Sequence, residues 1–497
     1  MLKLRKLRHF IGRLYNRMLS FEPFSLDALK RVMPYVLSCP YHCSDMTPGE
    51  LYMWHKEMNT QFCVWNDTFM VRKDLGDQPS FTWPYGADPD GMVEELRKYA
   101  IENDLPLRFR EINAETLEVM RAGRRFPSLM AAMDARWSDY FYSFEDALTF
   151  HGKKFSGQRN HINKFRRLYG EPDVRPLRPE DRPKLMRLLD AYAAEHAAGN
   201  AIERIELENT RRFIDVYEEL GLYAACLHVG EELAAFSIGG IVGDMLVIHV
   251  EKALRRFEGA YPTMYQGFVR LVGESCARPP RYVNREDDSG DPGLRTSKRQ
   301  YHPISMIDKY LVHVDSPAAR AWPLPMLRAG DVVLTEFREE DRAAYMHLNL
   351  DVENNRWWGY DYREDTGITG PIDENTFYDF VQYDMRAGDS INFAVRETES
   401  GEMIGEGILW HFTATGRAEV GLRLSPEYHG KGYGTAAYSA LANYAEQALG
   451  CKAVARCYLS NLPSYRMITG SGFRVVKQDA EFYYFERPER AAERRNA

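Results

Sequence analysis

The chain has 497 residues, a length that fits about two to four domains. Hydrophobic residues make up 44% and charged residues 27%, as in ordinary globular proteins, and the net charge of −8 argues against a surface coated for nucleic acid. No apolar run approaches the roughly 18 residues that a membrane-spanning helix needs, so we expect no transmembrane segment.

Two further features bear on the compartment. The seven cysteines are scattered, which indicates a reducing environment, and the close pair Cys39 and Cys43 has no second pair at metal-ligand spacing, so we expect no metal site. The first residues lack the apolar core of a signal peptide, and we expect a cytoplasmic protein. Residues 2–17 are basic with apolar side chains on one helical face, which fits docking on anionic lipid or RNA, or a capping helix with a solvated basic face.

The first 310 residues alternate between helical and extended patterns. Hydrophobic periodicity predicts amphipathic helices over Ser25–Tyr35 and Val93–Asn103, and one longer helix over Phe144–Tyr169. Phe62–Val71 is predicted to be a strand because it is rich in aromatic and β-branched residues.

A new unit is predicted to begin near Pro172. Residues 178–181, Arg-Pro-Glu-Asp, are typical of a helix start, and the helix is expected to run through Glu195. Three consecutive strands are predicted next, at Leu222–Val229, Glu232–Val242 and Met245–Val250, with breaks at Gly230 and Gly243.

Two charged segments of this region are candidates for function. Residues 151–167 carry six cations and no acid, so the helix could follow a phosphate backbone, or its cations could simply pair with the acidic remainder of the chain. Glu286, Asp287 and Asp288 lie just before Gly290 and Gly293 and could orient a substrate amine or take its proton. They could equally cap the next helix or pair with the following cations. Mg²⁺ binding is disfavoured, because only one acidic cluster is visible.

Several strings between about residues 24 and 314 resemble the bacterial family similar to the C-terminal part of phosphatidylglycerol lysyltransferase. They are 152–165 (GKKFSGQRNHINKF), 251–255 (EKALR) with 259–261 (GAY), and 284–290 (NREDDSG) continuing to Lys298, Pro303 and Lys309-Tyr310. The resemblance implies two joined acyltransferase-type halves and transfer of an aminoacyl group from a charged tRNA to an amine or hydroxyl. Asp287 is the catalytic candidate. Because the chain lacks a membrane-spanning part, a lipid acceptor is doubtful.

A proline-rich stretch at 314–328 predicts a domain boundary, and a glycine-rich turn follows it at 429–434 (HGKGYG). The turn lies between a predicted strand, 419–424, and a predicted helix, an arrangement that suits a pyrophosphate. It does not match a P-loop. It matches the looser dinucleotide fingerprint, but no acid follows at the distance that a ribose requires.

The turn resembles the signature of the GNAT acetyltransferase family, with His429 in place of Gln or Arg. Asn461, Ser464 and Gly472-Phe473 fit the later block of that family, and 394–407 fits its preceding hairpin. The resemblance covers about residues 332–486 and is nearest to the ribosomal-protein and N-terminal acetylating branch. It implies acetyl-CoA as co-substrate and an amine-bearing small molecule or peptide as acceptor. The implied acetyl-CoA contacts are Leu422, Arg423, Leu424, His429, Gly430, Lys431, Gly432, Tyr433, Gly434, Thr435 and Asn461.

The catalytic roles follow from the same resemblance. An attacking amine has a pKa near ~10.4 and needs a base; Glu419 is the first candidate and Glu406 the second, although either carboxylate could be structural. The tyrosine that often protonates the thiolate is replaced by Ile468, so Ser464 is the candidate acid and Tyr465 the fallback. Asn461 is expected to orient the pantetheine arm.

These patterns predict an α+β (mixed α/β) chain of three tandem GNAT-type acyl-CoA N-acyltransferase folds, each a twisted, mostly antiparallel sheet flanked by helices. The expected boundaries are 1–170 and 171–315 for the two lysyltransferase-like halves, 316–330 for a linker, 331–488 for the acetyltransferase and 489–497 for a charged tail. The function expected is acyl transfer in both parts. The alternatives are an N-terminal part that only binds RNA or protein, and a chain that only senses CoA.

Overall fold

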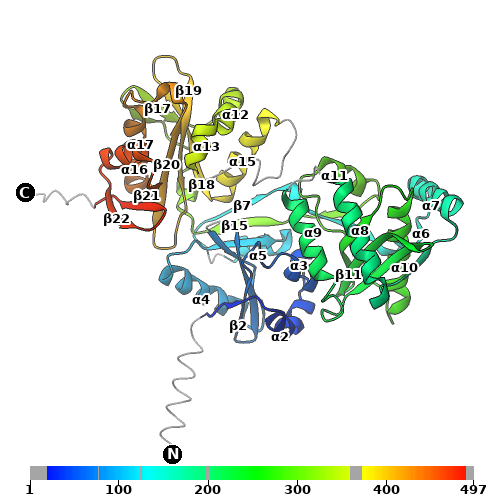
Figure 1. Ribbon diagram of the computed structural model, residues 1–497. Helices are drawn as coiled ribbons and strands as arrows, with labels where there is room; N and C mark the ends of the chain where they lie inside the picture. The colour runs from blue at the N-terminus through cyan, green and yellow to red at the C-terminus, as the bar shows by residue number, and fades with distance from the viewer. Residues whose placement is uncertain (1–18, 76–77, 124–125, 197–200, 359–371, 489–497) are drawn as a thin grey trace, which may run out of the picture.

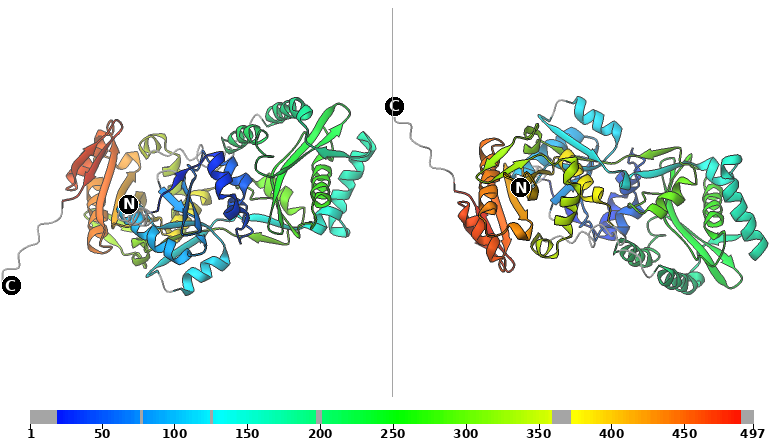
Figure 2. Two further views of the ribbon diagram at one scale, coloured as in Figure 1. Left: turned by 90° about the horizontal axis from the view of Figure 1, so that it is seen from below. Right: turned by 90° about the horizontal axis from the view of Figure 1, so that it is seen from above.

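The chain folds into three mixed sheets with helices on their faces, as a computed structural model describes it over residues 19–75, 78–123, 126–196, 201–358 and 372–488. The basic segment 2–17 and the charged tail 489–497 lie outside the described residues. Figures 1 and 2 show the three sheets in a row, with the first in the middle, the second (green) on one side and the third (orange and red) on the other. The expected α+β class is confirmed.

The first sheet has the strand order β1-β2-β3-β4-β6-β15-β7, with β5 paired to β3. Its strands are β1 (Glu22–Pro23), β2 (Gln61–Trp65), β3 (Thr68–Leu75), β4 (Gln78–Phe81), β5 (Tyr85–Gly86), β6 (Arg108–Ile112), β7 (Leu129–Met133) and β15 (Tyr310–Val314). The helices of this part are α2 (Leu26–Leu37), α3 (Pro48–Met53), α4 (Pro89–Glu102) and α5 (Ala114–Ala122). Helices α2 and α4 confirm the two amphipathic helices predicted there.

One predicted strand was wrong, because the chain turns within it. Residues 62–71 contain the end of β2 and the start of β3, which pair as a hairpin. Asn66 and Asp67 form the turn with φ of 48° and 53°. Two adjacent residues at positive φ match the twist of a tight hairpin, and Asn and Asp tolerate this conformation.

The second sheet has the order β14-β8-β13-β12-β11-β10-β9. Its strands are β8 (Asp139–Ser143), β9 (Asp173–Pro176), β10 (Tyr223–Val229), β11 (Glu232–Val242), β12 (Met245–Ala253), β13 (Tyr282–Asn284) and β14 (Ser305–Ile307). The helices are α6 (Phe144–Thr149), α7 (Ser156–Tyr169), α8 (Arg182–Glu195), α9 (Ala201–Phe213), α10 (Ala260–Ser275) and α11 (Pro292–Arg299). The predicted strands β10, β11 and β12 and the end of α8 at Glu195 are confirmed.

The single helix predicted over residues 144–169 is interrupted, so that prediction was wrong. Helix α6 ends at Thr149, where Phe150 has φ of 46° and Gly152 has φ of 90°. A short 3₁₀ turn at Lys153–Phe155 then leads into α7. Periodicity alone does not reveal this break, because Phe150 and Phe155 both keep their apolar side chains buried in the core.

The third sheet has the order β16-β17-β18-β19-β20-β21-β23-β22. Its strands are β16 (Leu327–Ala329), β17 (Val332–Thr335), β18 (Ser390–Glu397), β19 (Met403–Trp410), β20 (Arg417–Leu424), β21 (Lys452–Tyr458), β22 (Arg474–Gln478) and β23 (Phe482–Glu486). The helices are α12 (Arg342–Leu350), α13 (Val352–Trp358), α15 (Glu374–Ala387), α16 (Tyr433–Gln447) and α17 (Leu462–Gly470).

The segments that start at Arg178 and at Arg338 have the same order of elements. The backbone N–H of Arg178 donates to Asp181 at the start of α8, and that of Arg338 donates to Asp341 at the start of α12. Each start is followed by antiparallel strands and then by a strand–helix–parallel strand unit, β12-α10-β13 in the second sheet and β20-α16-β21 in the third. The two units are therefore versions of one fold.

The strands divide between the first two sheets at a different place from the expected boundary at residue 170. Strand β8 already belongs to the second sheet, and β15 returns to the first sheet between β6 and β7. Apolar residues of both sheets, among them Phe69 and Phe236, also share one buried cluster. The first two sheets therefore form one packed unit.

The expected linker at 316–330 packs against the third sheet, and its residues 327–329 form strand β16 of that sheet. Ala318 and Ala321 are buried, and the Ser316 hydroxyl donates to the Gly388 carbonyl at 2.8 Å. The third sheet is also docked onto the first by Arg108, which lies 2.9 Å from Asp389. The three sheets thus form one continuous body.

Candidate active sites

Strands β20 and β21 run side by side and then diverge. They pair in parallel only at 417–419 with 452–454, and Glu419 opposite Val454 is the last pair. Beyond this point β21 pairs with β23 alone, while Leu422, Arg423 and Leu424 pair with β19 on their other side. The edge of β20 that faces β21 is thus left without a strand partner in the described chain. These are the three residues predicted to hold a pantetheine arm.

Because β20 and β21 diverge after Glu419, they enclose a wedge-shaped gap with Glu419 at its apex. The glycine turn lies at the open end of this wedge. Gly430 and Gly432 have φ of 74° and 85°, and a Cβ on either would meet nothing within 4 Å. Gly432 is the N-cap of α16, and no side chain caps the helix. The N–H groups of Tyr433, Gly434 and Thr435 therefore begin a helix whose positive end faces open space, which suits an anion.

The two side chains that flank Gly430 and Gly432 steady the turn. Nε2 of His429 lies 2.9 Å from the Leu424 carbonyl oxygen, which ties the turn to the end of β20. The ammonium of Lys431 lies 4.7 Å from the ring centre of Tyr428. His429 thus has a structural partner of its own at the end of β20.

Asn461 and Ser464 lie where β21 ends, at the other arm of the wedge. Asn461 is the N-cap of α17, and its Oδ1 accepts the Ser464 N–H at 3.1 Å, so its Nδ2 remains available to a ligand. Tyr465 packs on Tyr483, and Ile468 is buried in the core. Ser464 and Asn461 are thus the polar groups of this helix start.

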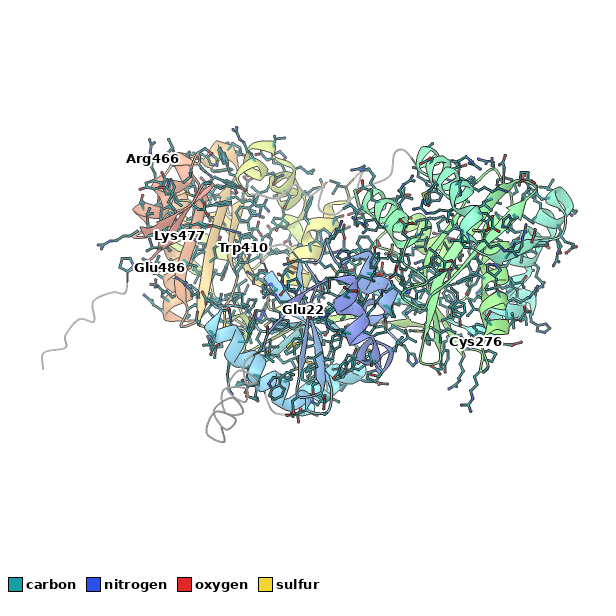
Figure 3. All side chains as sticks on the ribbon, turned by 60° about the horizontal axis from the view of Figure 1, so that its bottom comes forward. Glu22, Cys276, Trp410, Arg466, Lys477 and Glu486 are labelled. Carbon is teal, nitrogen blue, oxygen red and sulfur yellow. The ribbon has the colours of Figure 1, made fainter. Side chains whose placement is uncertain are left out.

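Glu419 lies at the apex of the wedge between two basic groups. Its carboxylate oxygens lie 2.8 Å from Nδ1 of His411 and 3.2 Å from Nε of Arg456. His411 has φ of 48° and stacks on Trp410, which ends β19 and is labelled in Figure 3. The predicted base is thus held in place by a histidine that could share its proton.

Glu406, the second candidate base, is saturated with hydrogen bonds. It is 1% exposed, and its Oε1 accepts from Tyr345 at 2.8 Å and from Asn392 at 2.7 Å. Its Oε2 accepts two bonds from Arg423, at 2.9 and 2.7 Å. No lone pair faces a substrate, so the geometry gives Glu406 a structural role that joins β19 and β20 to α12, and the expectation of a base there is corrected.

The corresponding turn of the second sheet is closed. Gly259 caps α10 with φ of 81°, as Gly432 caps α16, but a Cβ there would lie 2.3 Å from the His161 carbonyl oxygen. Helix α7 therefore fills the space that the third sheet leaves open. A pyrophosphate has no room at this turn.

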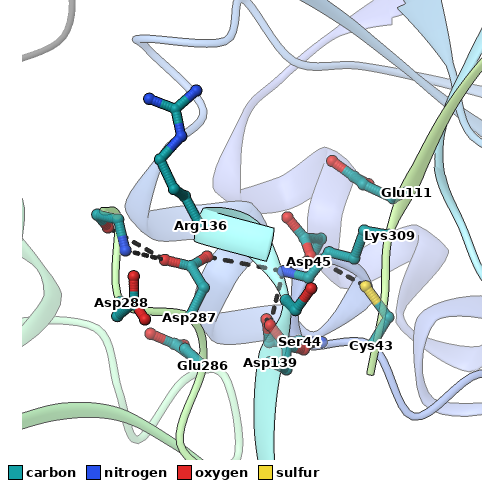
Figure 4. A network of polar contacts seen from close by, with 12 residues as sticks. Cys43, Ser44, Asp45, Glu111, Arg136, Asp139, Glu286, Asp287, Asp288 and Lys309 are labelled. Atoms are coloured by element: carbon teal, nitrogen blue, oxygen red, sulfur yellow. Dashed lines mark hydrogen bonds and ion pairs between the residues drawn. The ribbon is translucent and has the colours of Figure 1, made fainter. Parts of the chain in front are cut away.

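A buried ionic cluster lies between the first and second sheets, and Figure 4 shows it from close by. The Lys309 ammonium lies 2.5 Å from Asp45, 2.6 Å from Asp139 and 3.7 Å from Asp287. We call these four residues the Lys309 cluster. Burial disfavours the charged ammonium, but Asp139 and Asp45 outweigh it and raise the pKa of Lys309. The cation is therefore held in its charged form.

Asp287, the catalytic candidate, is the most exposed acid of this cluster. Its side chain is 20% exposed, whereas Asp139 is fully buried. Burial raises the pKa of Asp287, and Lys309 and Lys298 oppose this shift. Asp288 instead pairs with Arg295 at 2.8 Å, and Asp291, not the predicted cluster, caps α11. Asp287 does not cap α11, but it faces Lys309, and its Oδ1 accepts hydrogen bonds from the N–H and hydroxyl of Ser289 at 2.9 and 3.1 Å.

Half of the six cations in residues 151–167 pair with acids. Lys154 pairs with Asp146 at 2.8 Å, Lys164 pairs with Glu258, and Arg166 lies 3.3 Å from Glu171. Figure 1 shows α7 on the side of the second sheet that faces away from the first. The hypothesis that the cations of residues 151–167 pair with acids of the chain is thus supported for three of the six cations.

A family model described as "Phosphatidylglycerol lysyltransferase, C-terminal" matches residues 39–313, more than half of the 497 residues. The chain belongs to this family. A model for the acetyltransferase (GNAT) domain matches residues 331–474, so a GNAT domain follows the lysyltransferase-family part. Both family resemblances are confirmed, and the protein is an acyltransferase by fold.

Individual relatives cover parts of this lysyltransferase-family protein. A conserved protein of unknown function from Bacteroides thetaiotaomicron is 25% identical, with a TM-score of 0.55 over 60% of this chain and 100% of that chain. L-PGS from Bacillus licheniformis is 14% identical, with a TM-score of 0.43 over 59% of this chain and 93% of its own. Mycobacterium smegmatis RimJ in complex with CoA-disulfide is 20% identical, with a TM-score of 0.28 over 33% and 88%.

A curated relative is an uncharacterized protein of Mycoplasmoides gallisepticum, 22% identical over 178 residues. The lysyltransferase-family protein spans 56% of that relative's length, and the match covers 36% of this chain. Within the described residues, no helix is long and apolar enough to cross a membrane.

Sequence reasoning missed two groups in this lysyltransferase-family protein. His411 follows a strand directly and is isolated in the sequence, so no spacing links it to Glu419. Lys309 and Asp139 are 170 residues apart and meet only because β15 and β8 lie in adjoining sheets. Lys309 belongs to a sequence string that resembles the lysyltransferase family, but the sequence does not reveal that Asp45 and Asp139 are its charge partners.

Proposed function

We propose that the GNAT domain transfers an acetyl group from acetyl-CoA to an amine. The observation that carries this proposal is the open glycine turn beside the unpaired edge of β20. Helix N-termini suit a pyrophosphate, and an unpaired strand edge suits the amides of a pantetheine arm. The proposed contacts are the backbone of 422–424, the turn 429–435 and the Asn461 side chain.

Acetyl transfer would then take place near Glu419, at the apex of the wedge. The acetyl thioester is already activated, so the protein must orient it and accept the proton of the attacking amine. Glu419 is the proposed proton acceptor, and His411 shares the proton through Nδ1. Ser464 donates a proton to the departing thiolate, directly or through water, and Asn461 orients the pantetheine arm.

Changing Glu419 to Gln is expected to lower kcat by about 10²–10⁴-fold, because general base catalysis contributes this much. The affinity for acetyl-CoA should stay the same, since Glu419 lies outside the glycine turn. Transfer from labelled acetyl-CoA to a panel of amines measures the rate, and calorimetry measures the affinity. Glu402→Gln, which changes an exposed acid just before β19, is the control. Full activity in the Glu419 variant would refute the assignment of Glu419 as the base. If the wild type binds acetyl-CoA but transfers no acetyl group, the domain is a CoA sensor.

We further propose that the lysyltransferase-family part transfers an aminoacyl group from a charged tRNA to an amine or hydroxyl. Family membership supports this proposal, and so does the closed turn at Gly259, because a donor other than CoA is needed there. Asp287, accessible beside Lys309, is the proposed catalytic acid or base. Both donors occur in the cytoplasm and all seven cysteines are free, so we place both reactions there.

Changing Asp287 to Asn is expected to reduce aminoacyl transfer about 10²-fold or more. Transfer is measured with charged tRNA and amine or hydroxyl acceptors, and tRNA binding is measured in parallel. Asp291→Asn, which alters a helix cap nearby, serves as the control. If tRNA binds but no wild-type transfer occurs, the part is a binding module that serves the acetyltransferase.

A further inference from the structure

The ionisable groups between the first and second sheets leave two acids without a cation. Each carboxylate of the Lys309 cluster faces the ammonium, and Glu111 lies 2.6 Å from Lys73 and 3.4 Å from Arg110. Glu50 and Glu286 have no ion pair with a lysine or arginine of the described chain. This buried region therefore holds more acids than cations, since Lys309 alone faces three carboxylates.

Glu50 and Glu286 flank His249. Nδ1 of His249 lies 2.8 Å from Oε1 of Glu286, and one ligand atom from each of the three residues lies within 4.8 Å of the others. His249 is 6% exposed, and its Nε2 has no hydrogen-bond partner among the described residues. A buried nitrogen without a partner is destabilising, so this ring is incompletely satisfied by the described protein groups alone.

The local backbone is shaped to bring these side chains together. His249 is the extra residue of a bulge, because Val250 pairs with Ile238 and Ile248 pairs with Gly239. A Cβ on Gly49 would come within 2.4 Å of His249 Nε2, so only glycine leaves room for the ring. Glu286 has φ of 58°, which is unfavourable for a glutamate. Bulges and strained residues often mark functional sites.

We propose that Glu50, His249 and Glu286 bind a divalent transition-metal ion of the Zn²⁺ type. One imidazole nitrogen and two carboxylate oxygens form a common ligand set for such ions and leave a coordination position open. The two positive charges of the ion would balance the two unpaired carboxylates.

A second group, Cys43 with Asp45 and Asp139, has similar spacing but is already occupied. The Lys309 ammonium lies 2.5 Å from Asp45 and 2.6 Å from Asp139, where a metal ion would have to sit. The presence of this ammonium distinguishes the two groups. The proposed ion would also connect the two halves, because Glu50 comes from α3 and the other two ligands come from the second sheet. The inference is independent of the proposed transferase activities.

The test uses the full chain, purified and freed of metal with a chelator. Zn²⁺ is titrated by calorimetry, and Co²⁺ is titrated with its visible absorption as a second readout. We expect one ion per chain. Glu50→Gln and His249→Gln should weaken binding about tenfold or more, because each removes a ligand or its charge. Cys43→Ser is the matched control, since it alters only the group that holds Lys309.

Melting of the metal-free proteins shows whether the variants fold. Metal-free Glu50→Gln should melt no lower than the metal-free wild type, because it removes an unpaired charge, and Zn²⁺ should raise the melting temperature of the wild type only. The proposal is overturned if the wild type binds no ion, if both Gln variants bind as the wild type does, or if Cys43→Ser abolishes binding.

Discussion

Replacing Gly432 by tryptophan is expected to abolish acetyl-CoA binding while the domain remains folded. Gly432 has φ of 85° and open space around its missing Cβ, so the new side chain would occupy the space that the turn leaves for a ligand. The backbone strain costs about 1–2 kcal/mol. We expect affinity to fall at least about hundredfold, which corresponds to about 3 kcal/mol. Calorimetric titration of acetyl-CoA measures the effect.

The control for Gly432 is Gly401, in the turn between β18 and β19. It has φ of 72°, and a Cβ there would also meet nothing within 4 Å, so Gly401→Trp adds the same strain at a different place. Both variants should lose similar stability, and only the Gly432 variant should lose binding. NADH is titrated alongside, because binding of NADH alone would assign the turn to a dinucleotide and refute the acetyltransferase proposal.

Replacing Lys309 by methionine should destabilise the unit formed by the first two sheets by about 3–5 kcal/mol. The substitution would leave Asp45, Asp139 and Asp287 close together without their cation, and breaking a buried ion pair typically costs this much. Calorimetric unfolding of the full chain measures the loss. Lys30→Met is the matched control, because the Lys30–Glu219 pair at 2.6 Å has the same chemistry but 40% and 49% exposed side chains. Lys30→Met should lower the free energy of unfolding by less than about 1 kcal/mol. If both variants lose the same stability, burial is not the reason for the effect at Lys309.

The same ammonium also predicts a dependence on pH. Burial disfavours the charge of Asp45, but Lys309 and Lys73 outweigh it and hold the pKa of this carboxyl well below its usual range. A carboxyl with a depressed folded pKa stabilises the protein above its unfolded pKa of about 3.8, and this contribution is lost as the pH falls below that value. In the Lys309 variant this acid-sensitive contribution should shrink.

The sequence predicted elements well where local signals are strong. The helix start at Arg178, the strands around Gly230 and Gly243 and the glycine turn at 429–434 depend on residues close in the chain, and the structure confirms these elements. The failures at Asn66-Asp67 and Phe150 are breaks where non-glycine residues adopt positive φ. Asn-Asp is a turn signal that the strand prediction overlooked, whereas phenylalanine gives no such signal. The structural role of Glu406 was hidden because its partners Tyr345 and Arg423 come from different elements. Long-range pairing of this kind has no local signature.

The position of β15 has a consequence for the order in which the protein matures. Strands β6 and β7 are made early, but the strand that joins them, at Tyr310–Val314, follows the entire second sheet in the chain. During synthesis, the backbone groups of β6 and β7 that face β15 stay unpaired until nearly 200 more residues have followed Arg108–Ile112 and the late strand arrives. The first two sheets therefore complete their folding together, and Lys309, one residue before β15, reaches Asp45 and Asp139 only at that moment.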